Sequence, residues 1–308
     1  MRALIIVVAS GLAACGTEGG VDGGGAHLPS RGIAGWVVGD ALAIASPADA
    51  TLTDPSALVV GDEVVLYLTK TSPDGDAIVR TTSRDGTTFG APTLLLADAA
   101  APSVAARASG FWLAFEDGAG IALAESDDGL SFTRVASSGL EGLSDPSLVV
   151  DGDRLIVFAV SAEGSIVRSE AGSDHTFSAP TVVLAPIAEC TNAFGEPVPC
   201  WDGTALAGPD VRVATTPTGR TIWRMWFTGR TSVHTDLGFA ASSDGITGWT
   251  RYAFNPVIKQ STSSLSPTSI VFGADYLLYW AVPTTDASGI ANARITPSAT
   301  LSHPTETW

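Results

Sequence analysis

The sequence predicts an all-β fold, namely a five-bladed β-propeller of four-stranded antiparallel blades, and three observations lead to this prediction. The 308 residues include 33 glycines and 18 prolines, a content that disfavours a helical bundle. The apolar runs have the length of strands and are separated by turn residues. The same pattern of strands and turns returns five times, at the period of a propeller blade. A β-sandwich, the competing fold, would need fewer strands and no such period.

The first 14 residues have the features of an export signal. Met1-Arg2 is a short basic start, and residues 3–14 form an apolar run too short to span a bilayer in a mature protein. The run ends in Leu12-Ala13-Ala14-Cys15, which resembles the lipobox of bacterial lipoproteins. The resemblance implies cleavage before Cys15 and a diacylglycerol on its thiol. The alternative is an ordinary secretory signal that contains a cysteine.

Residues 15–30 are predicted to be the lipidated cysteine and a flexible tether, and residues 31–308 a single propeller domain. Residues 16–30 contain six glycines and no periodic apolar pattern. The chain is therefore expected to be anchored to a membrane by lipid, on the extracytoplasmic side of the bacterial cell envelope. Gly16 is not the aspartate that favours inner-membrane retention, so we expect the outer membrane where the source has one.

The two remaining cysteines, Cys190 and Cys200, are expected to form a disulfide. An exported protein meets an oxidising compartment, and Cys15 is taken up by lipid. Two buried free thiols are the alternative. A bond across so short a loop gives modest stability and mainly shapes the loop.

Five repeated units follow, and each begins at a proline with a turn residue before it. Successive prolines are 47, 44, 63 and 58 residues apart. The five starts are Asp54-Pro55-Ser56, Ala101-Pro102-Ser103, Asp145-Pro146-Ser147, Gly208-Pro209-Asp210 and Ser266-Pro267-Thr268.

Strand patterns and Gly-containing turns fill each unit. The first unit has Ala57–Val60, Val64–Thr69, Ala77–Thr82 and Pro92–Leu96, with Ser83-Arg84-Asp85-Gly86 as a hairpin turn. The next three units show the same pattern, with longer strands at Phe111–Phe115, Ile121–Glu125, Leu155–Val160, Ile166–Ser169, Ile222–Phe227 and Leu237–Ala241. Tryptophans 112, 223, 226 and 280 lie within strand patterns, so we expect them in the core between blades.

The fifth unit has only three clear strands, at Ile270–Phe272, Tyr276–Val282 and Ile290–Ile295. Ile33–Val38 lies before the first unit and is strand-like. We expect it to supply the missing outer strand, because closing the ring with N-terminal chain removes an open edge.

The charge balance excludes one class of partner. Acidic residues outnumber basic ones 32 to 16, for a formal net charge of −16, so no basic stripe could follow a phosphate backbone. We expect no nucleic acid partner and a soluble, monomeric domain.

Taken together, the Asp-Pro starts of units one and three and the Ser-x-Asp-Gly-x-x-aromatic turns resemble the five-bladed propeller glycosidases. These include glycoside hydrolase family 43 and the invertase and levansucrase families, and the resemblance covers roughly residues 50–300. It implies an axial funnel where three carboxylates meet from blades one, three and four. Two of them act as general base and general acid, and the third tunes and orients them.

The family's site residues match this sequence only in part. Asp54 matches the base and Asp145 the modulator. The acid is the glutamate of a Glu-Gly-Pro triplet at the start of blade four, and here the triplet is Ala207-Gly208-Pro209. A methyl group therefore replaces the proton donor, which puts hydrolysis in doubt.

Three residues are candidate replacement acids. Asp210 follows Pro209 directly, and Glu196 lies on the loop between the cysteines. Glu189 precedes Cys190, as in the Glu-Cys of the invertase-type families, but a separate blade start follows it, which disfavours it. The alternative for Asp54 and Asp145 is that they only initiate turns and cap backbone N–H groups.

Two further side chains are candidates for ligand binding. Trp201 adjoins Cys200 on an irregular loop, where an aromatic ring could stack on a sugar or anchor the loop. His234 lies in a polar hairpin of blade four, where a single histidine is more often a surface residue. The four histidines show no metal-ligand spacing, and we expect neither a metal nor a cofactor.

The sequence thus predicts a lipid-anchored carbohydrate-active propeller. It would bind a polysaccharide or oligosaccharide in the axial funnel and hydrolyse it if a replacement acid is present. Two alternatives remain open, a non-catalytic glycan-binding protein on a decayed glycosidase scaffold and a protein-interaction propeller.

Overall fold

The computed structural model describes residues 36–295, except residues 43, 46–48, 193, 216–218, 260–264 and 283–288. The signal segment, the tether and Cys15 lie outside the described residues. In the described part of the chain there is no helix long and apolar enough to cross a membrane.

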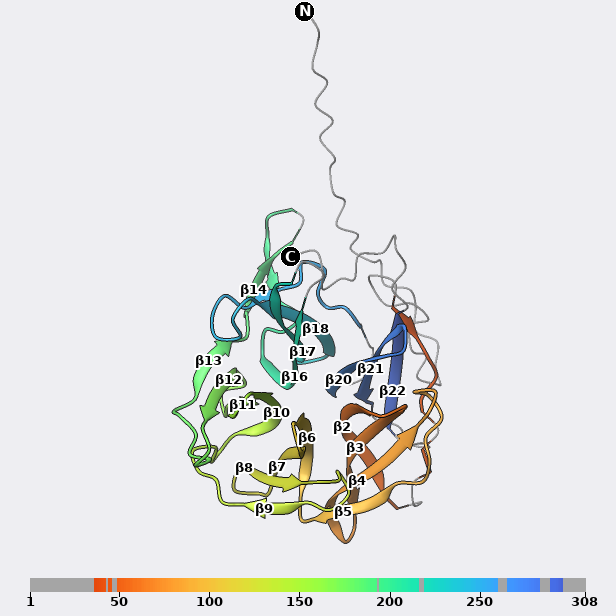
Figure 1. Cartoon of the computed structure of the whole chain (residues 1–308). Helices are drawn as coiled ribbons and strands as arrows, with labels where there is room; N and C mark the ends of the chain where they lie inside the picture. Colours follow the sequence, from red (N-terminus) through yellow and green to blue (C-terminus); the bar gives the residue numbers. More distant parts are fainter. Residues whose placement is uncertain are drawn as a thin grey trace, which may run out of the picture.

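Five antiparallel sheets of four strands surround a common axis, as Figure 1 shows, so the predicted propeller is confirmed. Blade one is β2 (Thr51–Val60), β3 (Glu63–Ser72), β4 (Gly75–Ser83) and β5 (Thr93–Ala97). Blade two is β6 (Ala100–Arg107), β7 (Gly110–Glu116), β8 (Ile121–Ser126) and β9 (Thr133–Val135). Blade three is β10 (Ser144–Asp151), β11 (Arg154–Val160), β12 (Ile166–Ala171) and β13 (Thr181–Leu184).

Blade four is β16 (Ala205–Thr215), β17 (Thr221–Arg230), β18 (Thr235–Ser242) and β19 (Thr250–Arg251). Blade five is β20 (Leu265–Phe272), β21 (Asp275–Ala281), β22 (Ile290–Ile295) and β1 (Val37–Val38). A two-stranded hairpin, β14 (Glu189–Thr191) and β15 (Pro197–Pro199), lies between blades three and four. In Figure 1 this hairpin extends away from the ring of innermost strands.

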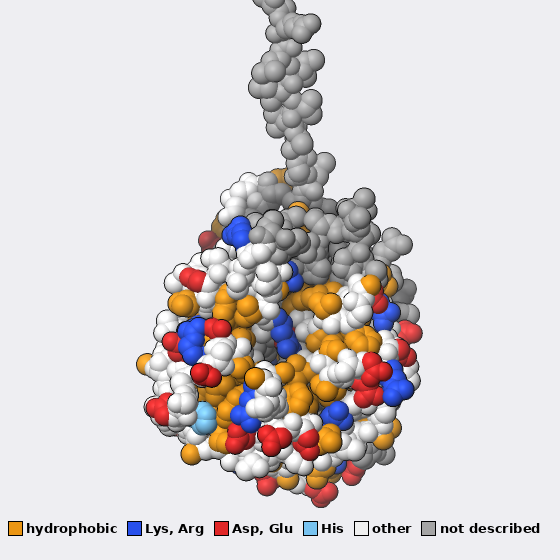
Figure 2. All heavy atoms as spheres, in the orientation of Figure 1, with side chains coloured by type: hydrophobic (Ala, Val, Ile, Leu, Met, Phe, Trp, Pro, Cys, Tyr) orange, Lys and Arg blue, Asp and Glu red, His pale blue; other side chains and the backbone are white. Residues whose placement is uncertain are grey.

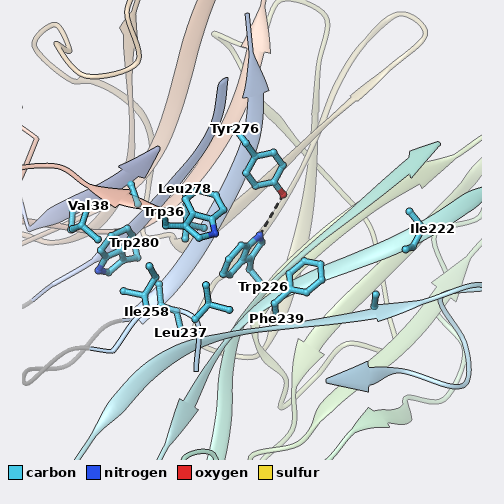
Figure 3. Packing of buried hydrophobic residues seen from close by; sticks show 14 residues of the cluster. Trp36, Val38, Ile222, Trp226, Leu237, Phe239, Ile258, Tyr276, Leu278 and Trp280 are labelled. Atoms are coloured by element: carbon cyan, nitrogen blue, oxygen red, sulfur yellow. Dashed lines mark hydrogen bonds between the residues drawn. The ribbon is translucent and has the colours of Figure 1, made fainter. Parts of the chain in front are cut away.

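The N-terminal strand closes the ring as the sequence predicts. Val37 and Val38 pair with Arg294 and Ala293 of β22, so β1 is the outer strand of blade five. Trp36 lies between blades four and five, with its ring centroid 5.4 Å from that of Trp226 and 5.5 Å from that of Tyr276. Figure 3 shows these rings together, with the Trp226 indole donating to the Tyr276 hydroxyl at 3.4 Å.

Apolar side chains fill the spaces between neighbouring blades. The described residues form five buried clusters, one between each pair of adjacent blades. All four tryptophans expected in the core are buried there. A single twisted blade could not bury both faces, so stacking around the axis is what stabilises each sheet.

The innermost strands differ from the prediction at their starts. The prolines are not in turns before these strands but inside them, at a register shift near the axial end of each. A β-bulge leaves one residue without a ladder partner, so it accommodates a residue that lacks an N–H group. The strands therefore begin several residues earlier than the sequence suggested.

The Ser-x-Asp-Gly turns lie at the end of the blades opposite the bulges. In the first, the Ser83 hydroxyl donates to Asp85 at 2.9 Å, and Asp85 Oδ1 accepts the N–H groups of Thr87 and Thr88 at 2.7 Å. Gly86 has a φ of 73°, close to the 70° of Gly129 and the 71° of Gly245 in the equivalent turns. A side chain at Gly86 would collide with Leu277 of blade five. The motif is thus a structural turn that also packs one blade on the next.

Candidate functional site

The five bulges meet at the axis and form a small pocket. It is lined from all five blades by the bulge residues, their prolines and several residues that follow, and has about 320 Å³ of empty space, including the part open to solvent. Figure 2 shows one face of the ring, with orange hydrophobic atoms and blue basic atoms around its centre. The described residues that line the axial pocket include carboxylates and no Lys or Arg.

The residue before each proline has a left-handed backbone. The φ angles are 47° for Asp54, 46° for Ala101, 49° for Asp145, 49° for Gly208 and 49° for Ser266. Residues other than glycine rarely adopt this conformation, and it costs about 1–3 kcal/mol at each. Two of the five positions carry carboxylates, and these are the two aspartates singled out from the sequence.

Asp54 is held at the pocket by two hydroxyl groups. Its Oδ2 accepts from Thr53 at 2.9 Å and its Oδ1 from Ser266 of blade five at 2.8 Å. Asp54 therefore has a fixed orientation between blades one and five.

Asp145 lies in the same group of charges. Its Oδ2 accepts the N–H of Gly208 at 3.1 Å. Burial raises the pKa of Asp145, and the negative charge of Asp54 raises it further, whereas the Gly208 hydrogen bond and the positive charge of Arg230 lower it. Asp54 and Asp145 both line the axial pocket, so blades one and three bring these carboxylates into one electrostatic environment.

A third carboxylate, Glu116 at the end of β7, was not identified from the sequence. Its Oε1 accepts the backbone N–H of Asp145 at 2.6 Å, the role that Thr69 plays for Ala101 one blade earlier. Burial raises the pKa of Glu116, and the charges of Asp145, Asp54 and Asp76 act in the same direction. The only sequence signal is that Glu116 ends a strand that is otherwise apolar.

A ring of hydrogen bonds lies next to the bulges and joins all five blades. In each blade the residue after the proline accepts the backbone N–H of a residue in the next innermost strand. The five bonds join Val104 to Ser56, Leu148 to Ser103, Val211 to Ser147, Ser269 to Asp210 and Ala57 to Thr268, at 2.8 to 3.1 Å. All five acceptor residues are buried, so the ring satisfies N–H groups that water does not reach.

Asp210 is the member of this ring that blade four contributes. Its Oδ2 also accepts from the Ser269 hydroxyl at 2.8 Å, and its Oδ1 forms an ion pair with Arg212 at 2.8 Å. Arg212 in turn donates to the carbonyl of Ala57 and to the hydroxyl of Thr268, both at 3.1 Å. Both oxygens of Asp210 are thus used in contacts that join blades four, five and one.

Ala207, at the position of the family's acid, is 3% exposed and lines a second pocket between blades three and four. This pocket also contains Asp145, Glu163 and Arg230. The methyl group leaves open space where a glutamate side chain would extend.

The other predicted site residues lie away from the axis. Glu196 is exposed on the β14–β15 hairpin, where its carboxylate accepts from Asn192 at 3.1 Å. His234 is exposed in the β17–β18 turn, where its N–H donates to Thr231 at 2.9 Å. Neither lines the axial pocket or the pocket between blades three and four.

Trp201 packs on the side of blade four. Its ring centroid is 5.5 Å from that of Phe227, and it fills the space that a side chain at Gly229 or Gly238 would occupy. The neighbouring Asp202 is buried in an ion pair with Arg251 at 2.7 Å. These contacts favour the loop-anchor interpretation of Trp201 over the sugar-stacking one.

The predicted disulfide between Cys190 and Cys200 is present, and it joins the hairpin strands β14 and β15. Among the described residues, no group of three His, Cys, Asp or Glu side chains is placed to hold a metal ion.

Comparisons with known proteins support the fold. No protein-family model matches the sequence, and no curated protein sequence matches it. A thermostable family-43 glycoside hydrolase superposes with a TM-score of 0.58 at 16% identity, over 79% of this chain and 88% of that one. An α-L-arabinofuranosidase from Podospora anserina in complex with cellotriose gives 0.63 at 14% identity, over 88% and 99%. A GH62 hydrolase in complex with xylotriose gives 0.58 at 11% identity, over 84% and 97%.

These structures have the blade number and strand arrangement found here, at identities where likeness establishes the fold alone. The chain is therefore a five-bladed β-propeller with the fold of glycoside hydrolase families 43 and 62.

Proposed function

We propose that this protein binds a glycan over the axial pocket and does not hydrolyse it. The observation that carries this proposal is Ala207, a buried methyl group at the position of the family's acid, in a pocket that it shares with Asp145, while Asp54 and Asp145 are retained at the axial pocket. Hydrolysis requires one carboxyl group that protonates the leaving oxygen and one that activates water or attacks. A site with oriented carboxylates and no acid can still accept hydrogen bonds from sugar hydroxyl groups.

The contacts of Asp210 and Glu196, two of the candidate replacement acids, support binding without turnover. Asp210 uses both oxygens in the ring and the Arg212 ion pair, and Glu196 lies on the exposed hairpin. Two of the similar structures contain bound cellotriose and xylotriose, which suggests neutral oligosaccharides as first probes.

The test combines binding with product analysis on the full chain. Cellotriose, xylotriose and arabino-oligosaccharides are titrated by calorimetry, and the same mixtures are incubated and analysed by chromatography. We expect binding without product, and weaker binding in Asp54→Asn. Asp62→Asn, the same change in a turn at the opposite end of blade one, is the matched control and should bind as wild type. Absence of binding to every glycan would contradict the proposal.

Hydrolysis is the second candidate function, and Glu116 is the observation that favours it. Burial and the charges of Asp145 and Asp54 raise the pKa of Glu116, although the hydrogen bond from the Asp145 backbone N–H lowers it, and a carboxyl group with a raised pKa next to other carboxylates is suited to the role of a general acid. Product that disappears in Glu116→Gln but persists in Asp62→Asn would establish this function. If only Ala207→Glu forms product, the scaffold is that of an enzyme that has lost its acid.

We further propose that the chain is anchored by lipid on Cys15 and lies on the extracytoplasmic face of a bacterial envelope, in the outer membrane where the source has one. The Leu12-Ala13-Ala14-Cys15 sequence supports this. Expression with radiolabelled palmitate in a bacterial host should label the wild type and leave Cys15→Ser unlabelled. Equal labelling of both would contradict the proposal.

A further inference from the structure

The pocket between blades three and four is larger than the axial pocket. It has about 760 Å³ of empty space, including the part open to solvent, against about 320 Å³ at the axis. Its walls are the start of β10, the turn at residues 161–164, the residues that enter β16 and the end of β17. The cavity itself, about 420 Å³, is within the range of small-molecule binding sites.

Among the described residues that line this pocket, Arg230 is the only one with a basic side chain. Its Nε is buried and has no hydrogen-bond partner, and its guanidinium forms no ion pair within the described part of the chain. Leaving a partly buried cation without a counter-charge is costly, so the site favours an anion that reaches it.

The surroundings explain why the guanidinium lacks a partner. Ala205 pairs with Arg230 across β16 and β17, and Ala207 lies two residues further along the same strand. Neither alanine side chain has an oxygen atom, whereas the glutamate expected at position 207 from the family resemblance would have placed a carboxylate in the same pocket. The charge of Arg230 acts on Asp145 at the inner wall without an ion pair between them.

Two carboxyl groups of this pocket oppose an incoming anion, Asp145 at the inner wall, where burial raises its pKa and so favours its neutral form, and Glu163. The position of Glu163 limits its effect. It is exposed at the rim, where water and salt screen its interaction with an incoming anion. Arg230 is less exposed, and its planar guanidinium matches the two oxygens of a carboxylate.

We propose that the pocket between blades three and four binds an anionic sugar unit, a uronate, whose carboxylate pairs with Arg230. The inference rests on the proposed glycan-binding function and names the class of glycan. The carboxylate of the uronate occupies the place of the carboxylate that a glutamate at position 207 would have provided. The neighbouring sugar units of the glycan extend toward the axial pocket, because Asp145 lines both pockets.

The test compares probes that differ only in charge. Oligosaccharides of galacturonate and of glucuronate, their methyl esters and inorganic phosphate are titrated into the full chain by calorimetry. We expect at least one acidic oligosaccharide to bind about tenfold more tightly than its ester, the effect of one charge-assisted hydrogen-bond pair. Phosphate alone should bind more weakly than that oligosaccharide.

Three variants assign the effect to Arg230. Arg230→Gln should remove the difference between acid and ester, and Arg230→Lys should keep part of it. Arg84→Gln removes the same charge from an exposed turn at the opposite end of a blade and should bind as wild type. Melting temperatures of all variants establish that each is folded.

The outcomes separate this inference from the proposed function. If acid and ester bind equally, glycan binding stands and the inference is overturned. If phosphate binds as tightly as the acidic oligosaccharide, the site is a free-anion site and the inference is overturned. If neither these probes nor the neutral oligosaccharides bind, the proposed function fails as well.

Discussion

The backbone N–H of Ser269 in blade five donates to Oδ2 of Asp210 in blade four at 3.0 Å. The equivalent bond between every other pair of adjacent blades uses the hydroxyl of a serine or threonine. Asp210 therefore continues a repeated structural contact, and its carboxylate is part of what holds the propeller closed.

Removing the Asp210 carboxylate should destabilise the propeller. Asp210→Ala leaves the Ser269 N–H without its acceptor and Arg212 without its ion pair, for an expected loss of about 2–3 kcal/mol in the free energy of unfolding. Asp210→Ser restores a ring acceptor and should recover part of the loss. Chemical denaturation measures both, and an unchanged midpoint in Asp210→Ala would contradict a structural role.

A single hydroxyl of the ring should also contribute measurably. Ser147→Ala leaves the buried N–H of Val211 unpaired, which costs about 1–3 kcal/mol. The matched control is Ser243→Ala in an exposed turn, where we expect a change within about 0.5 kcal/mol. Equal effects of the two substitutions on the free energy of unfolding in urea would contradict a stabilising role of the hydrogen-bond ring.

Stability should fall as the pH rises from mildly acidic values, because the folded-state pKa values of Asp145 and Glu116 are raised. Each group holds its proton more tightly in the folded state. The contribution of each group to the free energy of unfolding is therefore present in full below its ordinary pKa of about 4. This contribution is lost as the pH rises through the pKa that the group has in the folded state. Glu116→Gln should gain stability relative to wild type over this interval, and a difference that does not vary with pH would contradict the assignment.

At more acidic pH the free energy of unfolding should change in the opposite direction and fall as the pH falls. Hydrogen bonds from Thr87 and Thr88 hold the pKa of Asp85 below its usual range, and those from Thr247 and Ile246 do the same for Asp244. Stability from these turns is present above the ordinary pKa of about 4 and is lost as the pH falls toward the lowered values. Between about pH 4 and pH 2, the double variant Asp85→Ala and Asp244→Ala should lose less stability than wild type. If the free energy of unfolding falls with pH equally steeply in both proteins, the assignment to these two turns is wrong.

Trp201→Ala should reduce stability without changing glycan affinity. Its ring lies on Gly229, Gly238 and Phe227, so we expect a loss of about 2–3 kcal/mol, below the range for fully buried tryptophans. Calorimetry with the best-binding oligosaccharide measures the affinity. A large loss of affinity in a stable variant would restore the sugar-stacking interpretation.

Much of the fold could be predicted because its signals are local and repeated. The five prolines, the Asp-Gly turns and the strand-like segment ending at Val38 each mark a blade element, and the cysteine pair was expected from the compartment. The starts of the innermost strands were placed too late, since a proline inside a strand is unexpected unless a bulge holds it.

Site residues could be predicted from the sequence only where a carboxylate stands at a recognisable position of a blade. Asp54 and Asp145 stand at equivalent points of two blades, and the resemblance to the propeller glycosidases implied that they converge at the axis. Glu116 contacts Asp145 from another blade, and Arg230 enters its pocket from the end of β17; both depend on how neighbouring blades stack. The ring role of Asp210 becomes visible only when it is compared with the residues after the other four prolines.

The most direct test of the central claim is a crystal structure of the protein with the best-binding oligosaccharide. The account predicts an intact glycan over the axial pocket, in contact with Asp54 and Asp145. A glycan bound on the blade sides or the rim loops, or a cleaved one in the axial pocket, would contradict it.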